Sequence, residues 1–539
     1  MSVTTASSIS STSAAPARVK LDHPVDVRAL IGFLLVMAGG LFFTAYSIFA
    51  DVEATGGKAP GLLPYLLLGV ALLIALGFEF VNGFHDTANA VATVIYTHSL
   101  KPQYAVVWSG LFNFLGVLTS SGLVAFGIVS LLPVELILQV GSDAGFAMVF
   151  ALLIAAIMWN LGTWWLGLPA SSSHTLIGSI IGVGVANALM RGRDGTSGVD
   201  WGKAVEIGEA LLLSPLVGFF AAALLLLSMK ALIKAPELYT APKADQPPPL
   251  WIRGLLILTC TLVSFFHGSN DGQKGMGLIM LILIGTVPTA YALNRALPAS
   301  HVAEFQAASA AAAKIIDDKA YGYNVIGNPR PAVTEYVTTR KAAAGTFPAL
   351  ALLVTDIGAQ VKNYGSLAGV PAAQVGNTRN DMYLTSEALR FLMKDKETGL
   401  QPADVATLNA YKKSLDASTK FIPTWVKVVV ALALGLGTMI GWKRIVMTVG
   451  EKIGKTHLTY AQGGAAELVA ASTIGLADVF GLPVSTTHVL SSGVAGTMWA
   501  AGSGVQMATI RNMLTAWVLT LPAAVLLSGT LYFIFRQVF

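Results

Sequence analysis

The chain has 539 residues, of which 54% are hydrophobic and only 12% are charged. Because this charged share is about half of that in ordinary soluble domains, the composition excludes a soluble enzyme or a soluble binding module. The formal net charge of +5 does not indicate a nucleic-acid partner, since Lys and Arg lie mostly between apolar runs, and the single cysteine, Cys260, excludes a disulfide framework.

Long runs without Asp, Glu, Lys or Arg recur along the whole chain. Several of them exceed the roughly 18–20 residues that a helix needs to cross a bilayer. A soluble core could hide one or two such runs, but not this many. The sequence therefore predicts an all-α polytopic protein of the lipid bilayer, with about 10–12 membrane segments. The runs are residues 29–50, 59–78, 102–134, 144–190, 479–510 and 512–535.

The N-terminal segment, residues 1–27, is rich in Ser, Thr and Ala and is predicted to be a disordered cytoplasmic tail. It lacks the charged-then-apolar order of a secretory signal, so residues 29–50 are predicted to be a retained first helix. Basic residues precede this helix, whereas Asp51 and Glu53 follow it. This asymmetry places the N-terminus in the cytoplasm.

The first membrane repeat is predicted to span residues 28–232. Its second helix runs into the acidic passage 82–90 (NGFHDTANA), where glycine favours a break before a half-helix that ends near residue 96. Further along, the uncharged run 144–190 is long enough for a full membrane helix followed by a shorter membrane segment. Pro169 and the three serines after it predict a re-entrant hairpin with a serine-rich tip.

A Pro-rich and Lys-bearing linker, residues 233–252, is followed by the second membrane repeat, which begins with residues 253–290 and resumes with residues 421–539. Residues 291–420 between these parts hold 14 basic and 11 acidic residues, too many for a membrane span. They are predicted to form an extramembrane insertion, with a disordered linker as the alternative.

Two polar passages each occur twice, which indicates two copies of one unit. Residues 82–90 are echoed by 267–275 (HGSNDGQKG), and residues 167–174 (GLPASSSH) by 481–488 (GLPVSTTH). The separation of the two passages is 129 residues longer in the second copy, nearly the length of the insertion. Polar, glycine-broken segments at matching positions of an internal repeat are the best sequence indication of a transporter's binding site.

The acidic passages carry Asp86 and Asp271, with Asn89 and Asn270 beside them. An ionised Asp facing lipid costs about 2.5–3.5 kcal/mol, so both are expected to face a cavity and a cation or proton. The oxygen-rich set suits a small hard cation. The alternative is that each Asp only caps a half-helix. That role could explain an Asp in one copy of the passage, but it explains two at equivalent positions less well.

The hydroxyl passages contain no acid. Each presents three hydroxyl side chains just after a proline, and hydroxyls with free backbone N–H groups at a half-helix N-terminus favour an anion. Two such tips approaching from opposite sides would surround a tetrahedral oxyanion. The alternative is Ser and Thr used for helix packing, and His174 and His488, which close the passages, fit structural roles. The six hydroxyl residues are Ser171, Ser172, Ser173, Ser485, Thr486 and Thr487.

With these four passages the chain resembles the phosphate inorganic transporter (PiT) family, in particular the bacterial branch that moves phosphate with protons, often as a neutral metal-phosphate complex. The resemblance implies inverted repeats with broken helices, a multi-pass place in the bacterial inner membrane, no cofactor, and a homodimer as one arrangement. It also implies that the six hydroxyl residues bind phosphate and that Asp86, Asn89, Asn270 and Asp271 bind the coupling cation.

Two departures from the family pattern bear on the coupling ion. The family has Asn where this chain has His85 and Asn where it has Lys274. An ammonium one helical turn beyond Asp271 can pair with it and exclude sodium, and His85 can exchange a proton near neutral pH. Both residues are therefore added to the predicted coupling set.

The function that these observations favour is a secondary active symporter that imports inorganic phosphate with protons, and not an enzyme. A sodium-coupled phosphate or sulfate permease is the alternative within transport, because hydroxyl and N–H donors bind either oxyanion. The alternative of another class is a membrane-embedded serine hydrolase using Ser171 or Ser173 with His174, although no strand-borne nucleophile elbow is present.

Overall fold

The computed structural model describes residues 21, 26–55, 62–86, 88–132, 134–139, 141–243, 246–298, 300–320 and 327–538. Most of the tail expected over residues 1–27 lies outside these ranges. Within them the chain is α-helical, apart from short 3-10 and π turns and one isolated bridge between Gly454 and Val505. The all-α prediction is confirmed.

The helices follow one another with few long connections. They are α1 (Val27–Ala54), α2 (Leu62–Asp86), α3 (Ala88–Tyr96), α4 (Pro102–Thr119), α5 (Leu123–Val129), α6 (Val134–Leu138), α7 (Asp143–Trp165), α8 (Ser172–Met190), α9 (Trp201–Leu232), α10 (Leu250–Thr286), α11 (Pro288–Tyr291), α12 (Ser300–Asp317), α13 (Arg330–Thr339), α14 (Thr346–Tyr364), α15 (Ala372–Lys394), α16 (Pro402–Thr419), α17 (Thr424–Thr438), α18 (Lys443–Met447), α19 (Tyr460–Val479), α20 (Thr486–Ala500) and α21 (Met507–Val538).

Seven helices in the described part of the chain are long and apolar enough to cross a membrane, or up to nine if each bent pair forms one span. This number is below the 10–12 segments expected, because some segments of the bundle are too short to cross a membrane alone. Helices α17 and α20 have 15 residues each. A full crossing needs about 20 residues, so these short helices must be completed by their neighbours.

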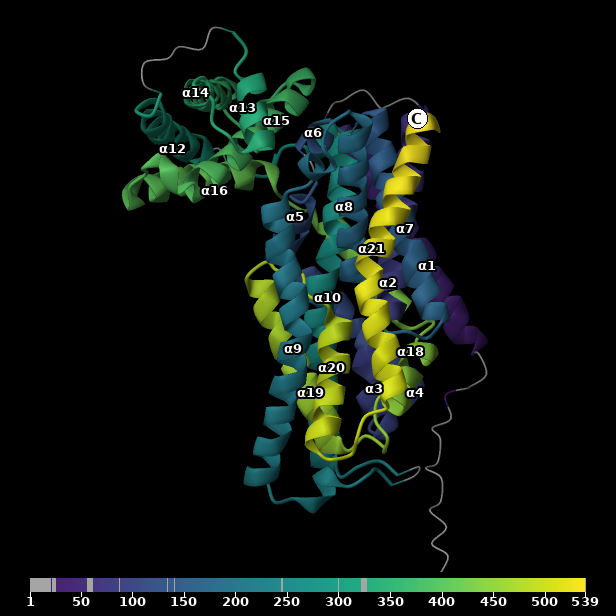
Figure 1. Ribbon diagram of the computed structural model, residues 1–539. Helices are drawn as coiled ribbons and strands as arrows, with labels where there is room; N and C mark the ends of the chain where they lie inside the picture. The colour runs from purple at the N-terminus through teal and green to yellow at the C-terminus, as the bar shows by residue number, and fades with distance from the viewer. Residues whose placement is uncertain are drawn as a thin grey trace, which may run out of the picture.

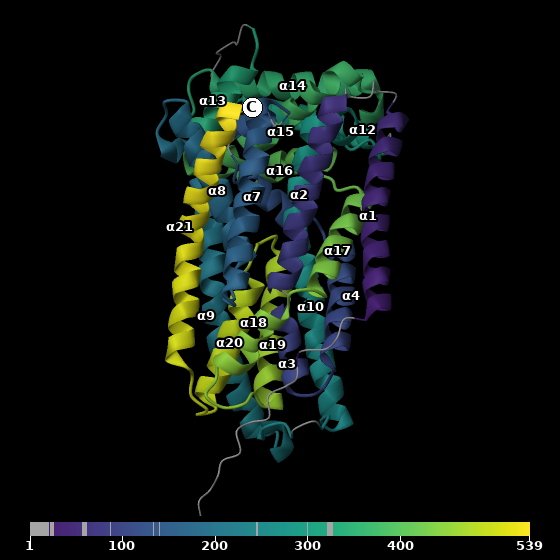
Figure 2. The same ribbon diagram turned by 90° about the vertical axis from the view of Figure 1, so that its right-hand side faces the viewer.

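The long helices form one elongated bundle, and helices α12 to α16 form a separate group at one end of it (Figure 1). The C-terminal end of α21 lies at this same end, whereas the connection from α9 to α10 lies at the opposite end (Figures 1 and 2). The α12–α16 group has apolar side chains of its own that are fully buried, including Phe305, Ile316, Leu389 and Tyr411.

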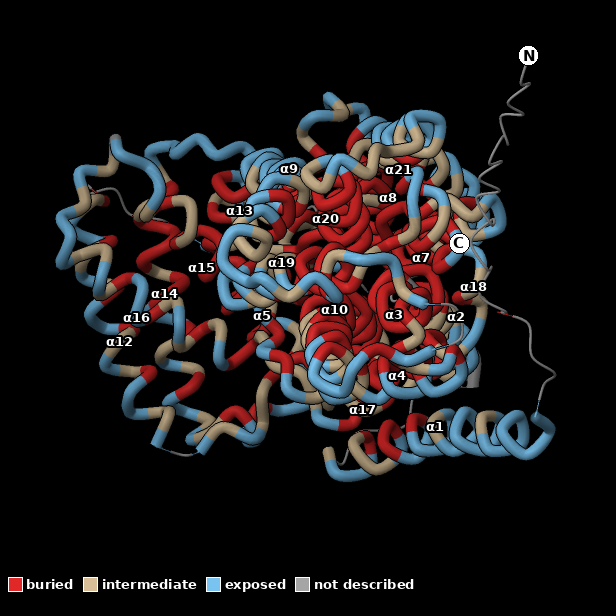
Figure 3. The backbone as a smooth tube through the Cα atoms, turned by 90° about the horizontal axis from the view of Figure 1, so that it is seen from below, coloured by how far each residue is buried: buried red, intermediate tan, exposed pale blue. Residues whose placement is uncertain are grey.

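Seen along the bundle, the buried residues gather where α3, α8, α10 and α20 meet (Figure 3). Helix α1 stands apart, with its apolar side chains largely exposed, as expected for a helix covered by lipid (Figure 3). The centre of the bundle is therefore the place where polar side chains are most removed from water and lipid.

The break expected in the first acidic passage falls at residue 87, which lies outside the described residues; α2 is described up to Asp86 and α3 from Ala88. The second passage lies inside α10, which continues unbroken for 37 residues from Leu250 to Thr286. Its glycines serve close packing: a Cβ on Gly268 would lie 2.2 Å from the carbonyl oxygen of Asn113 in α4. Small residues at such crossings let membrane helices approach closely.

The two hydroxyl passages share one backbone design. Gly167 and Gly481 follow the preceding helices, and both have φ of +66°, the left-handed conformation in which glycine ends a helix. Ser171 and Ser485 then cap the next helices, because their hydroxyls accept the backbone N–H groups of His174 and His488. Helix α8 runs from the centre toward the α12–α16 end, and α20 runs toward the other end (Figures 1 and 2).

Candidate functional site

The four polar passages meet in the middle of the bundle. The hydroxyl of Ser173, at the start of α8, donates to the carbonyl of Val484 in the second hairpin at 2.9 Å. The imidazole rings of His174 and His488 lie 4.7 Å apart between their centroids. The N-termini of α8 and α20 therefore face each other, and their positive dipole ends converge on one buried point.

The carboxylate of Asp86 occupies this point, and it is 3% exposed. Ser172 donates its hydroxyl to Asp86 Oδ2 at 2.5 Å, and Thr487 donates its hydroxyl to Asp86 Oδ1 at 3.0 Å. His85 Nδ1 lies 2.7 Å from Oδ1. One acidic side chain thus receives hydroxyl groups from both hairpins.

Asp271 of the second acidic passage lies beside two nitrogen-bearing side chains of its own helix. Lys274 Nζ lies 2.6 Å from Asp271 Oδ1, and His267 Nε2 lies 3.3 Å from Oδ2. Lys274 also donates to the hydroxyl of Ser173 at 2.5 Å. Asp271 and Lys274 are completely buried, so this ammonium links the second acidic passage to the first hairpin in a dry environment.

The two asparagines both donate hydrogen bonds to the second hairpin. Asn89 donates from Nδ2 to Thr487 Oγ1 and to the backbone carbonyl of Asp86, both at 2.9 Å. Asn270 donates to the carbonyl of Leu482 at 3.0 Å. In both residues the side-chain oxygen is buried without a donor among the described residues, which leaves it available to a ligand.

The six predicted hydroxyl residues have three different kinds of surroundings. Ser172, Ser173 and Thr487 lie at the meeting point of the passages, as described above. Ser171 and Ser485 are helix caps, and each hydroxyl accepts a backbone N–H group. Thr486 Oγ1 is buried and has no hydrogen-bond partner in the described part of the chain. The predicted coupling residues His85, Asp86, Asn89, Asn270, Asp271 and Lys274 are all buried in the same region.

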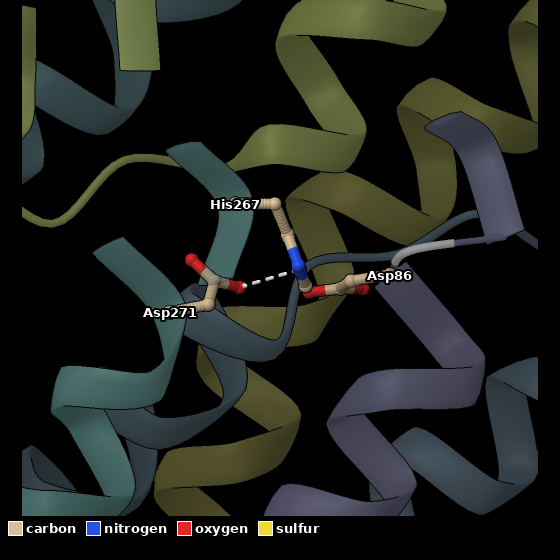
Figure 4. Close-up of side chains that lie close together, drawn as sticks. All are labelled: Asp86, His267 and Asp271. Carbon is tan, nitrogen blue, oxygen red and sulfur yellow. Dashed lines mark ion pairs between the residues drawn. The ribbon is translucent and has the colours of Figure 1, made fainter. Parts of the chain in front are cut away.

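Sequence reasoning did not single out three residues that the structure adds. Asn82 accepts the Ser172 hydroxyl at 2.8 Å, and Thr163 lies 3.0 Å from His85 Nε2. His267 lies beside Asp86 and Asp271 (Figure 4), and ligand atoms of these three residues lie within 4.8 Å of one another. Asn82 and His267 open the two copies of the acidic passage, so the repeat itself carried a signal for them.

This arrangement can bind charge of both signs. Convergent hydroxyls, helix N-termini and the Lys274 ammonium suit an anion, while the paired carboxylates suit a cation. It does not resemble a hydrolytic site, because Ser172 donates to carboxylate and amide oxygens and the His174 ring packs against His488. His488 in turn stacks on Trp517 with centroids 4.0 Å apart.

Comparison with known proteins finds several relatives of this chain. The sequence pattern of the phosphate transporter family matches residues 82–528. The chain is 44% identical over 489 residues to the low-affinity inorganic phosphate transporter PitA of Escherichia coli (strain K12), covering 88% of this chain and 97% of that protein. PitB of the same organism is 42% identical over 489 residues, with the same coverage.

A more distant relative is the probable low-affinity inorganic phosphate transporter of Bacillus subtilis (strain 168), 29% identical over 476 residues and covering 88% of this chain and 99% of that protein. A solved structure described as the sodium-dependent phosphate transporter has a TM-score of 0.48 and 20% identity, over 88% of this chain and 100% of that chain. With apolar helices long enough to span a membrane and a family match over most of its length, this multi-pass membrane protein belongs to the phosphate transporter family, whose members are transporters and not enzymes.

Proposed function

We propose that the chain is a secondary active transporter that imports inorganic phosphate together with protons across a bacterial inner membrane. The observation that carries this proposal is the double contact of Asp86 with the two hairpins. Ser172 from one hairpin and Thr487 from the other both donate to its carboxylate. In this structure the Asp86 carboxylate thus accepts hydrogen bonds from hydroxyl groups that the family resemblance assigns to phosphate.

This contact supports a simple mechanism of coupling. A hydroxyl group has one proton to donate, so Ser172 and Thr487 cannot serve Asp86 and phosphate fully at the same time. A cation that binds at Asp86 neutralises the carboxylate and weakens its hold on these hydroxyls. Cation binding therefore favours phosphate binding, and by thermodynamic linkage phosphate binding favours the cation.

Two features favour the proton as the coupling cation. His85 Nδ1 lies 2.7 Å from Asp86 Oδ1, and an imidazole is the side chain that exchanges protons near neutral pH. At the second passage the Lys274 ammonium already lies 2.6 Å from Asp271 and competes with a sodium ion there. The first acidic passage thus holds an imidazole next to its aspartate, and the second holds an ammonium.

The charges of the site also suit a neutral metal-phosphate complex as cargo. Asp86, Asp271 and Lys274 are all buried, and a fully charged ligand would have to be transferred into this dry region. A divalent metal ion and a hydrogen phosphate dianion bring no net charge together. The carboxylates can then face the metal while the hydroxyls and the ammonium face the phosphate.

Uptake of labelled phosphate into proteoliposomes tests this proposal. An inward proton gradient should drive accumulation, a protonophore should abolish it, and replacing sodium by potassium at constant pH should have no effect. Because phosphate itself titrates near neutral pH, the gradient is varied while the outer pH is held constant. Accumulation that requires sodium, or uptake of sulfate as fast as phosphate, would contradict the assigned coupling ion or substrate.

A further inference from the structure

We propose that the groove between helices α1, α4 and α17 binds an anionic phospholipid of the cytoplasmic leaflet. Helix α1 lies beside α17 and α4 at the edge of the bundle (Figures 2 and 3). The groove between them has a volume of about 1470 Å³, larger than the roughly 300–1,000 Å³ of ordinary small-molecule pockets. The ligand is part of the membrane and not a transported solute, so the proposal goes beyond the proposed function.

The groove widens toward the beginning of α1. At Gly40 the helix is close to α17, because a Cβ there would lie 3.2 Å from the side chain of Leu432. About two turns earlier, a Cβ on Gly32 would meet nothing within 4 Å, although Gly32 lines the groove. The walls suit hydrocarbon chains, because their large side chains are mostly apolar. They include Leu30, Phe33, Val36, Leu111, Phe114 and Leu432.

The wide part of the groove lies away from the α12–α16 group. Asp51, near the end of α1, accepts the hydroxyl of Tyr291 at 2.7 Å and the indole N–H of Trp425 at 3.0 Å. These two partners flank the α12–α16 group in the chain, so α1 begins at the opposite end of the bundle (Figure 2). The basic residues around the start of α1 indicate that this end faces the cytoplasm.

Three cationic side chains line the same end of the groove. Lys427, near the start of α17, donates to the carbonyl of Ser120 just after α4 at 2.7 Å, so α17 runs antiparallel to α4. The start of α4 and the end of α17 therefore lie together beside the start of α1. Lys101 directly precedes α4, and Lys443 and Arg444 follow α17, and all three line the groove.

This end of the groove suits the phosphate of a lipid head group. Asp26, which caps α1, is the one acidic side chain among the described residues of the groove, against the three basic ones. The guanidinium of Arg444 lies 4.5 Å from the ring centroid of Trp165 and donates to its backbone carbonyl, which fixes its position. Trp164 and Trp442 also line the groove, as aromatic rings do at membrane interfaces. Basic pockets between membrane helices on the cytoplasmic side typically bind anionic head groups.

A second copy of the chain suits this groove less well than a lipid does. Two copies related by a two-fold axis along the bilayer normal would place the basic ends of their grooves next to each other. Like charges at an interface oppose association, whereas the phosphate of a lipid neutralises them. The charge of the groove therefore favours the lipid.

Lipid binding is measured on the full-length protein in detergent by native mass spectrometry. Phosphatidylglycerol and phosphatidylethanolamine with the same acyl chains are the probes, because they differ only in the head group. We expect each chain to retain one phosphatidylglycerol at lower lipid concentration than phosphatidylethanolamine. Lys101→Gln should weaken phosphatidylglycerol binding about fivefold, and its combination with Lys443→Gln and Arg444→Gln about 100-fold. Lys234→Gln, a basic position after α9 outside the groove, is the control.

Gly32→Leu tests the groove itself. The new side chain has room, but it occupies the space of an acyl chain, so retention of both lipids should be lost. Gly39→Leu is the matched control, since a Cβ there also meets nothing within 4 Å and Gly39 does not line the groove. Equal retention of the two lipids by the native protein, or unchanged phosphatidylglycerol binding in the triple variant, overturns the proposal. A native dimer that Gly32→Leu separates also overturns it, because the groove would then be a subunit interface.

Discussion

At the scale of single residues, phosphate binding is expected to depend on the hydroxyl groups that donate hydrogen bonds to Asp86. We expect Ser172→Ala and Thr487→Ala each to raise the KM for phosphate uptake, because each removes a donor from a dry site. The loss of one such hydrogen bond costs about 1–3 kcal/mol, or roughly 5- to 150-fold. Initial rates of labelled phosphate uptake at several concentrations check this.

Thr497→Ala is the matched control for these variants. Thr497 lies on the same helix as Thr487 and is equally buried, but its hydroxyl donates to the carbonyl of Val494 in its own helix. Its removal should leave the KM unchanged. If Ser172→Ala and Thr487→Ala together transport with native kinetics, the hairpin tips do not bind the substrate.

The pair of Lys274 and Asp271 gives a second prediction at this scale. Both are completely buried, with 2.6 Å between Nζ and Oδ1. Lys274→Gln alone leaves an uncompensated charge on Asp271, and breaking a buried pair in this way costs about 3–5 kcal/mol. We expect Asp271→Asn combined with Lys274→Gln to recover most of the lost thermal stability, measured by unfolding in detergent, but not proton-driven uptake.

The recovery of stability distinguishes a paired charge from two independent ones. If the double variant is no more stable than Lys274→Gln, the two side chains do not interact through their charges. If the double variant accumulates phosphate like the native protein, neither charge takes part in coupling.

The candidate residues of the site were predictable from the repeat, but their individual contacts were not. Sequence spacing indicates that Ser171 to Ser173 lie at a hairpin tip, yet only the turn of helix that follows decides which hydroxyl points inward. Ser171 is used as a cap, whereas Ser172 contacts Asp86. The sequence does not distinguish His267 from a histidine with a structural role, because two of its neighbours, Asn113 and Asp86, come from other helices.

At the scale of helices, glycines that look alike in the sequence serve different purposes in the bundle. Gly167 and Gly481 end helices in the left-handed conformation, whereas Gly268 lies inside the continuous helix α10, where a Cβ would lie 2.2 Å from the carbonyl oxygen of Asn113. The difference depends on whether another backbone approaches, which is a property of the folded bundle.

The crossing of α4 and α10 tests this reading of glycine. A Cβ on Gly116 would lie 2.0 Å from the carbonyl oxygen of Phe265, so Gly116→Ala must push the two helices apart. We expect a loss of about 1–3 kcal/mol of stability, the usual cost of overpacking, seen as a lower unfolding temperature in detergent. Gly77→Ala is the control, since a Cβ there would meet nothing within 4 Å. Equal unfolding temperatures for both variants would contradict the tight crossing.

At the scale of the whole molecule, the end of the bundle opposite the α12–α16 group is expected to face the cytoplasm. The connection from α9 to α10 lies at this end (Figure 1), and Lys230, in the last turn of α9, and Lys234 after it are typical of a cytoplasmic loop. On a Cys260→Ser background we expect Lys362→Cys, in α14, to react with a membrane-impermeant maleimide added to whole cells. Lys234→Cys should react only after the cells are opened. The reverse pattern would invert the predicted sidedness.

The contact between the α12–α16 group and the bundle includes one buried carboxylate, that of Asp200. Asp200, just before α9, lies 2.7 Å from the guanidinium of Arg390 in α15 and 3.4 Å from that of Arg340. Burial by itself acts to raise the pKa of Asp200, but the hydrogen bond and charge of Arg390, with the charge of Arg340, outweigh burial and lower it below its ordinary value of 3.8. The docked state therefore favours the ionised carboxylate of Asp200. This contact stabilises docking at pH values above 3.8, and the stabilisation is lost as the pH falls through the lowered pKa of Asp200.

We therefore expect Asp200→Asn to loosen the docking at neutral pH. Asn can still cap α9 in place of Asp200, which accepts the backbone N–H of Lys203, so the change removes the charge and little else. The loss of a hydrogen bond to a charged group, about 1.5–3 kcal/mol, should speed amide hydrogen exchange in α15 more than about tenfold while α8 is unaffected. Asp194→Asn, an exposed helix cap in the same loop, is the control. If α15 exchanges at the same rate in Asp200→Asn and in the native protein, the group is held in place by its apolar contacts alone.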